Sequence, residues 1–380
     1  MNFSLPCSVF VLNAAKQIYV KIFISNPMKK KWINVVIILI ITVVFLWWSL
    51  KDNFNEVVET LFSSNLGWLF VALLTFAVYM LFDTLSTYGI IKIYKKDATF
   101  KFALYLGLIN KFFCGITPLS SGGQPMQVYE LKKKGVPVST GANIEVQAYM
   151  MFQIALMLTA IVSVIFDQIF HFFQYIPVLQ HMMVVGFVIN LVVLLALLFI
   201  SFSKNFNRVV IRGIINALAK FGLVRNKKAR IEKWENACQN YYENGRELLR
   251  NKNVFIRGVC YQCLALLAYY ILPIFIALAI GCADNLDIIN VFTASSFVFV
   301  MGCYVPIPGA SGGMEAGFMG FFGNFVAGPA LNVFVLLWRG LTYYLPMIVG
   351  AIAFNIYNGK GAIAEAEKIA KTADAPKKKR

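Results

Sequence analysis

Charged side chains are scarce in this sequence. Only 14% of its 380 residues are Asp, Glu, Lys or Arg, whereas 59% are hydrophobic. A soluble domain carries roughly a quarter charged residues, so the composition excludes an ordinary soluble protein. Because the apolar runs cover most of the chain, we expect one integral membrane domain and not two soluble ones.

Residues that carry catalytic or metal chemistry are also few. The chain has two histidines, His171 and His181, and seven scattered cysteines. It contains no H-E-x-x-H, Walker A, G-x-S-x-G or kinase pattern. Cys260-x-x-Cys263 lies in an apolar run, where two small packing residues are a better interpretation than a redox pair. The sequence therefore predicts no catalytic residue, no metal site and no cofactor.

The net charge of +17 is distributed in short basic clusters between the apolar runs. Such clusters are typical of cytoplasmic loops that face an anionic leaflet. No long segment combines basic and aromatic residues, so we expect no nucleic-acid partner. The expected partners are membrane phospholipids and anionic lipid head groups, and a homo-oligomer stays open as an alternative.

Six apolar segments are long enough to cross a membrane, which takes about 20 helical residues. The expected spans are 33–50, 67–91, 143–166, 182–202, 255–280 and 329–356. Residues 203–253 interrupt them with twelve Lys or Arg and four Glu. This insertion predicts either a cytoplasmic helical hairpin, which we favour, or a surface helix that senses anionic lipid. The fold class is thus an all-α, polytopic membrane helix bundle over 33–357.

The two ends of the chain differ from this domain. Residues 1–32 fit a secretory signal poorly, because the lysines at 16 and 21 follow the short apolar run. We expect translation to begin at Met28, or residues 1–27 to lie on the membrane surface. Residues 358–380 are a polar, basic tail that we expect to be flexible and cytoplasmic.

A short P-x-x-S-G-G motif occurs twice, 190 residues apart. Its copies are Pro118-Leu-Ser-Ser121-Gly122-Gly123 and Pro308-Gly-Ala-Ser311-Gly312-Gly313. Each copy lies between two apolar runs that are too short to span a membrane alone, and its Pro and Gly end one helix before the next begins. Paired interrupted helices in the two halves of a membrane protein point to a transport site. Ordinary turns between helices are the alternative.

The basic clusters give the two broken elements opposite orientations. The first, 102–134, begins and ends beside lysines, so the positive-inside rule makes it a re-entrant hairpin that enters from the cytoplasm. The second, 288–327, is expected to enter from outside. We therefore expect about six full spans, two oppositely oriented re-entrant hairpins that form an inverted repeat, and cytoplasmic termini. The expected location is the cell (plasma) membrane.

Ionisable residues within apolar segments are costly and mark functional sites by default. Those in this chain are Asp83, Lys111, Glu130, Glu145, Glu315 and Arg339. Arg339 lies in the middle of the last span, where it can bind a phosphate through two parallel hydrogen bonds and can pair with Glu315. Lys111 can meet the same anion from the cytoplasmic side, although neutralisation by Asp83 is the alternative. Glu130 is expected to pair with Lys133 or Lys134.

The predicted lipid-binding site combines these charges with the two breaks. The second half of each hairpin presents backbone N–H groups and a partial positive charge at the break, which favours a phosphate or a carboxylate. The site residues we expect are Thr117, Pro118, Ser121, Gly122, Gly123, Pro308, Ser311, Gly312, Gly313, Glu315, Arg339 and Lys111.

Two longer segments carry a family resemblance. They are Thr117-Pro118-Leu-Ser-Ser-Gly122-Gly123-Gln-Pro125 and Pro306-Ile-Pro308-Gly309-Ala-Ser-Gly312-Gly313-Met-Glu315-Ala-Gly317. In this order they resemble the signatures of the flippase-like membrane domain of lysylphosphatidylglycerol synthases, over about 33–357. The resemblance implies a domain that moves a cationic lipid to the outer leaflet and confers resistance to cationic antimicrobial peptides. In that family, a soluble C-terminal domain transfers lysine from lysyl-tRNA to phosphatidylglycerol, and only 23 residues follow 357 here.

We therefore expect a lipid flippase or transporter that moves an anionic or aminoacylated phospholipid between leaflets, and we do not expect an enzyme. A phosphatidylglycerol lysyltransferase is one alternative, but it would need an acyl-transfer site and a tRNA-binding domain. A membrane scaffold or regulator of another envelope enzyme is the other alternative.

Opposite orientation of the two breaks is directly testable. Single cysteines introduced as Ser121→Cys and Ser311→Cys into a Cys-free protein should react from different sides of the membrane. We expect a membrane-impermeant thiol reagent to label position 121 from the cytoplasm and position 311 from outside. Equal labelling of both positions from one side would contradict the predicted inverted repeat.

Overall fold

The structure is a computed structural model. It describes residues 59, 62–117, 120–173, 177–202, 250–302, 310, 312–326 and 328–357. These residues are almost entirely helical, and no strand occurs among them. The expected span at 33–50, residues 1–32, most of the basic insertion and the tail 358–380 lie outside the described residues.

Five helices in the described part of the chain are long and apolar enough to cross a membrane. They are α4 (Leu66–Tyr94), α7 (Val138–Phe170), α8 (Pro177–Phe202), α11 (Lys252–Ile280) and a last helix (Pro329–Tyr357). The last helix consists of α14 (Pro329–Arg339), the π-helical turn η4 (Gly340–Tyr344) and a final α-helical stretch. These five match five of the six expected spans, and the all-α membrane bundle is confirmed.

Helix α7 is longer at both ends than the apolar segment 143–166 that predicted it. It begins directly after Pro137 and ends just before His171, which has the left-handed φ of +55°. Apolar residues mark where the helix contacts hydrocarbon or core, whereas proline and a left-handed residue mark where the helical backbone stops. The length predicted from hydropathy alone was therefore too short for this helix.

Two pairs of shorter helices lie between the long ones. The first pair is α5 (Phe100–Ile116) and α6 (Gly123–Lys133), and the second is α12 (Ile288–Gly302) and α13 (Gly313–Phe322). None of the four is among the helices long enough to cross a membrane. Helix α13 ends before the expected 327, because turns follow at Gly323 and the N–H groups of Phe325 and Val326 both bond to the Phe322 carbonyl.

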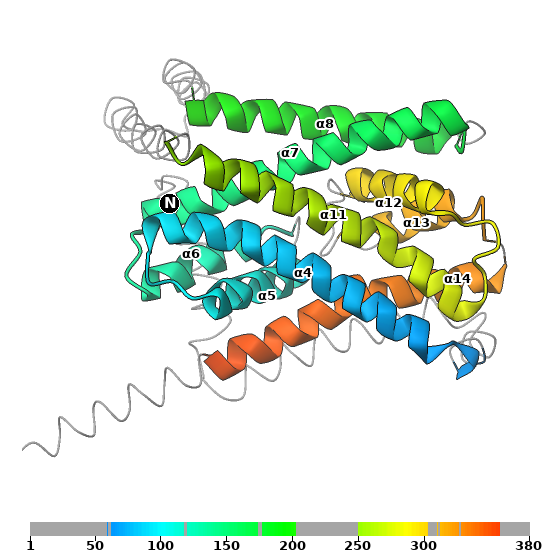
Figure 1. Ribbon diagram of the computed structural model, residues 1–380, viewed down its shortest axis with the longest axis horizontal. Coiled ribbons are helices and arrows are strands. Elements are labelled where there is room, and N and C mark those ends of the chain that lie inside the picture. The colour runs from blue at the N-terminus through cyan, green and yellow to red at the C-terminus, as the bar shows by residue number, and fades with distance from the viewer. Residues whose placement is uncertain are drawn as a thin grey trace, which may run out of the picture.

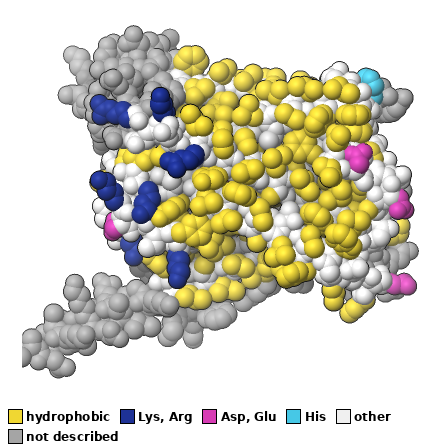
Figure 2. Space-filling model, viewed as in Figure 1, with side chains coloured by type: hydrophobic (Ala, Val, Ile, Leu, Met, Phe, Trp, Pro, Cys, Tyr) yellow, Lys and Arg dark blue, Asp and Glu magenta, His cyan; other side chains and the backbone are white. Residues whose placement is uncertain are grey.

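The two short-helix pairs lie at opposite ends of the bundle (Figure 1). Helices α4 and α11 are antiparallel neighbours, since the Asn65 N–H bonds to the Ala279 carbonyl at 2.8 Å and the Ser86 hydroxyl bonds to the Gly258 carbonyl at 3.0 Å. Figure 2 shows Lys and Arg side chains gathered at the end that holds α5 and α6, and a broad apolar surface beside them. Most of the visible Asp and Glu side chains lie at the opposite end. We call these the basic end and the acidic end.

The buried apolar side chains form two clusters, one toward each end. The acidic-end cluster joins α12, α13 and α14 and includes Phe76 and Phe334. The basic-end cluster joins α5 and α6 and includes Ile90 and Phe354. Helix α4 and the last helix each contribute to both clusters, so they pass through the whole core. A polar side chain that lies between the two clusters is therefore in the middle of the bundle, far from both ends.

Close packing of the last helix on α5 gives a stability test. A Cβ added at Gly350 would lie 2.3 Å from the Leu108 carbonyl oxygen, whereas one added at Gly340 would meet nothing within 4 Å. Because backbone cannot move aside cheaply, Gly350→Ala should cost about 1–3 kcal/mol, as overpacked cores do. Gly340→Ala is the matched control in the same helix and should unfold at the wild-type temperature. Equal thermal midpoints for both variants in detergent would contradict this packing.

Candidate functional site

The second break begins the candidate site, at the start of α13. Gly312 has φ +82°, and its N–H donates to Glu315 Oε2 at 2.6 Å. A Glu three residues into a helix that accepts the N-cap N–H supplies one half of a capping box. The carboxylate also lies at the positive end of the helix dipole. Glu315 therefore fixes the start of α13 and places a negative charge inside the bundle.

Arg339, the last residue of α14, pairs with this carboxylate. Its Nε donates to Glu315 Oε1 at 2.7 Å, and the two side chains are only 6% and 13% exposed. The guanidinium also lies 4.7 Å from the centre of the Tyr343 ring, a cation–π contact. The expected Arg339–Glu315 pair is thus formed, and Glu315 uses its two oxygens for two different partners.

Tyr343 connects this pair to the first short-helix pair. Its hydroxyl donates to the Gly115 carbonyl, 2.9 Å away, near the end of α5. Tyr343 lies in η4, one turn after Arg339, and π-helical turns occur frequently at functional sites. The two breaks are therefore joined through the side chains of Tyr343, Arg339 and Glu315, although their motifs are 190 residues apart.

The first break is held by side-chain hydrogen bonds to backbone. Thr117 Oγ1 donates to the Phe113 carbonyl at 2.6 Å and accepts the Gly122 N–H at 2.8 Å. Cys114 Sγ lies 3.0 Å from the Ser120 carbonyl oxygen. Gly123, the first residue of α6, packs so closely on α5 that an added Cβ would lie 1.8 Å from the Asn110 side-chain oxygen. The described residues on the two sides of this break therefore pack closely, and Thr117 satisfies one of the backbone N–H groups.

Lys111 belongs to a neighbouring polar cluster. Its Nζ lies 3.8 Å from Asp83 Oδ2 and donates to the Tyr79 hydroxyl. Asp83 Oδ1 accepts a hydrogen bond from Gln262 at 3.0 Å. The Tyr79 ring contacts Tyr269 at a centroid distance of 5.3 Å. The pairing of Lys111 with Asp83 is the alternative that the sequence left open, and it places a second, partly exposed ion pair in the bundle.

The polar residues of these clusters lie where the two hydrophobic clusters meet. On α4, Asp83 lies between Met80 of the acidic-end cluster and Ile90 of the basic-end cluster. On the last helix, Arg339 follows Trp338 of the acidic-end cluster and precedes Tyr343, which packs on the basic-end cluster. The candidate site is therefore a polar layer inside the bundle.

The other predicted residues are placed as follows. Glu130 is fully buried and pairs with Lys133 at 2.7 Å, as expected, and Ser121 is exposed. Glu145 is buried on α7, and among the described residues its Oε1 has no hydrogen-bond partner. Pro118, Pro308 and Ser311 lie outside the described residues. No group of three His, Cys, Asp or Glu that could hold a metal ion occurs in the part of the chain that the structure describes.

Sequence reasoning missed three polar contributors: Tyr79, Asn110 and Gln262. Asn110 and Gln262 are uncharged polar residues within apolar runs, and this signal could have identified them. Tyr79 could have been found because it lies one helical turn before Asp83, on the same face of α4.

Comparison with known proteins agrees with this architecture. Residues 32–350 match the family described as the lysylphosphatidylglycerol synthase TM region. A UPF0104 membrane protein of Archaeoglobus fulgidus is 26% identical over 270 residues, which are 68% of this chain and 76% of that protein. An uncharacterized protein of Mycoplasma genitalium is 23% identical over 360 residues, 85% of this chain and 86% of its own length. No solved structure matches this chain.

The fold defines a multi-pass α-helical membrane protein in which side chains of the last helix contact both short-helix pairs at an internal polar layer. Within this class, the chain belongs to the lysylphosphatidylglycerol synthase TM region family.

Thr117 offers a test of how the first break is held. Thr117→Val removes the oxygen that accepts the Gly122 N–H and leaves that buried donor without its partner, which should cost about 1–3 kcal/mol. Thr87→Val is the control, since the Thr87 hydroxyl only donates to the Asp83 carbonyl one turn earlier. We expect a lower thermal midpoint in detergent for Thr117→Val alone. A wild-type midpoint for Thr117→Val would show that this contact does not hold the turn.

Proposed function

We propose that this protein moves a phospholipid between the two leaflets of the cell membrane and that its head group passes the polar layer. The observation that carries the proposal is the buried Arg339–Glu315 pair, 2.7 Å apart, at the start of a helix that begins inside the bundle. A buried ion pair adds little net stability compared with apolar residues of the same volume. Charges within a membrane domain are therefore a functional hypothesis by default.

The link between the two breaks supports a transport site over a purely structural ion pair. Tyr343 contacts the Arg339 guanidinium with its ring and the Gly115 carbonyl with its hydroxyl. A head group at Arg339 would therefore perturb both interrupted helices at once. Interrupted helices that meet inside the bundle are the arrangement in which secondary transporters bind their substrates.

The substrate that we propose is an anionic or aminoacylated phospholipid. Phosphate suits Arg339 because a guanidinium can bind two phosphate oxygens at once. A head group that also carries an ammonium, as lysylphosphatidylglycerol does, supplies a counter-charge for Glu315 or Asp83. Each ion pair can then be exchanged for protein–lipid pairs without leaving a bare charge in the bundle. The family description, which names this lipid, supports the same class of substrate.

The proposed orientation places the basic end and both termini in the cytoplasm. The α5–α6 and α12–α13 pairs would then be re-entrant hairpins that enter from opposite faces. Outward movement of a cationic lipid would reduce the negative charge of the cell surface, which is the physical basis for the expected resistance to cationic antimicrobial peptides. We propose transport without lipid synthesis, and we expect purified protein given lysyl-tRNA and phosphatidylglycerol to form no lysyl lipid.

Substitutions at Arg339 test the proposal. Arg339→Lys keeps the charge but loses the planar fork of donors. In proteoliposomes with acyl-labelled fluorescent phospholipids, dithionite should quench the inner-leaflet pool of wild type as those lipids reach the outer leaflet. Both Arg339→Lys and Arg339→Ala should slow this exchange about tenfold or more, the change expected when about 1.4 kcal/mol of binding is lost. Arg257→Ala is the control, because Arg257 is exposed at the basic end.

The same variants separate a transport site from a structural ion pair. A structural pair broken on one side should cost about 3–5 kcal/mol and appear first as a lower thermal midpoint. In that case Arg339→Met combined with Glu315→Gln should recover stability. Wild-type transport by a stable Arg339→Ala protein would reject the proposal, and so would lysyl lipid formation without lipid movement.

A further inference from the structure

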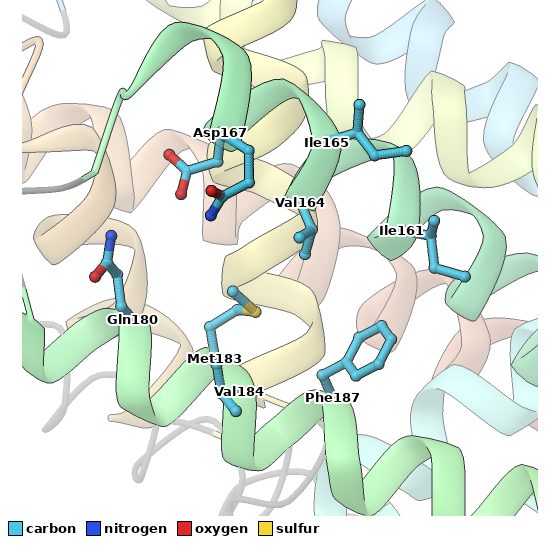
Figure 3. Close-up of a pocket in the computed structure, with 9 residues that line it drawn as sticks. Ile161, Val164, Ile165, Asp167, Gln180, Met183, Val184 and Phe187 are labelled. Atoms are coloured by element: carbon cyan, nitrogen blue, oxygen red, sulfur yellow. The ribbon is translucent and has the colours of Figure 1, made fainter.

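A groove lies between α7 and α8 near the acidic end. Its volume is 360 Å³. The residues that line it are Ile161, Val164, Ile165, Asp167, Gln168, Gln180, Met183, Val184 and Phe187 (Figure 3). No residue of α5, α6, α12 or α13 lines it, so the groove is separate from the polar layer described above.

The groove changes from polar to apolar along its length. Asp167 on α7 and Gln180 on α8 lie at one end, and Ile161 and Phe187 lie at the other (Figure 3). The polar end is next to the turn between the two helices. Seven residues separate Ile161 from Gln168, which is about 10 Å along a helix axis. A lipid has this profile when it lies in one leaflet, with its head group at the surface and its chain directed inward.

Asp167 gives the polar end a defined chemistry. The residue is 6% exposed, and its Oδ1 accepts the Phe173 N–H at 3.1 Å. An ionised carboxylate only accepts hydrogen bonds, whereas the carboxamides of Gln168 and Gln180 also donate them. One end of the groove thus offers an acceptor with negative charge beside two neutral donors. A phosphate can bond to the carboxamides and an ammonium to the carboxylate.

The charged residues at this end of the bundle disfavour an anionic head group. Asp284 and Asp287 lie at the same end of the bundle. The described parts of the loops there, at 171–173, 281–287 and 323–326, contain no Lys or Arg. The local field therefore favours a head group that carries a positive charge as well as its phosphate.

We infer that this groove binds one phospholipid with a primary ammonium in its head group, taken from the leaflet at the acidic end. The groove holds the head group and the upper part of one chain. Its edge is open toward hydrocarbon, because Ile161, Ile165 and Val184 are 45%, 50% and 52% exposed, so the rest of the lipid lies in the bilayer. The inference concerns binding and holds whether or not the protein moves lipids.

Photo-cross-linking of the full chain in vesicles tests the groove. The probes are phosphatidylethanolamine, phosphatidylcholine and phosphatidylglycerol, each with the same diazirine-bearing acyl chain. Phosphatidylcholine keeps the positive charge but has no N–H donor, and phosphatidylglycerol has no positive charge. We expect phosphatidylethanolamine to label the peptides that contain Met183 and Phe187 about fivefold more than the other two lipids, a difference of about 1 kcal/mol.

Two variants locate the binding and a third is the control. Asp167→Asn keeps an oxygen for the Phe173 N–H but removes the charge, so the preference for phosphatidylethanolamine should disappear. Val184→Trp should fill the groove and reduce labelling by all three lipids. Val185→Trp is matched to it, since Val185 is 58% exposed on the same helix and does not line the groove. The Val185→Trp protein should be labelled to the same extent as wild type.

Equal labelling of wild type by the three lipids would overturn the inference, because it would indicate ordinary lipid at the protein surface. Unchanged selectivity in Asp167→Asn would also overturn it, as would equal effects of Val184→Trp and Val185→Trp. If Asp167→Asn unfolds in detergent, the two valine variants still decide the outcome, since neither changes a hydrogen bond.

Discussion

Interrupted helices release backbone N–H and C=O groups, and a membrane interior offers no water to satisfy them. The arrangement of polar side chains inside this bundle follows from that constraint. Thr117 takes the Gly122 N–H, Glu315 takes the Gly312 N–H, and the Tyr343 hydroxyl donates to the Gly115 carbonyl. Among the described residues, each break therefore has a backbone group that a side chain satisfies, and the last of these side chains comes from the opposite half of the chain.

The two cations of the polar layer are each balanced by a nearby anion. Arg339 faces Glu315, and Lys111 faces Asp83, so each cation has an anion within 4 Å. A site of paired charges can accept a ligand that carries both signs at a lower cost than a site with one uncompensated charge, because the partners can be exchanged. The excess positive charge of the chain does not lie in this polar layer, because most described lysines are at the basic end (Figure 2).

Patterns along the sequence predicted the elements, whereas contacts across the sequence needed the structure. Apolar length identified the five described spans, and the repeated motif identified both breaks, because each depends on neighbouring residues. The early end of α13 at Phe322 depends on turns that an apolar run does not reveal. Charge alone suggested the pairs of Arg339 with Glu315 and of Lys111 with Asp83, but it could not choose between an ion pair and a free ligand site. The contact of Tyr343 with Gly115, 228 residues away, depends on packing that no local pattern encodes.

The position of the π-helical turn in the last helix has a mechanical consequence. Its first part, with Phe334 and Trp338, is packed in the acidic-end cluster, and its second part, with Met347 and Phe354, is packed in the basic-end cluster. The turn at Gly340–Tyr344 lies where the helix passes from one to the other. If one cluster tilted or twisted relative to the other, the backbone of this turn would be twisted. Arg339 lies directly before the turn and Tyr343 lies within it. The distances within the polar layer would then change when the acidic-end and basic-end clusters move relative to each other.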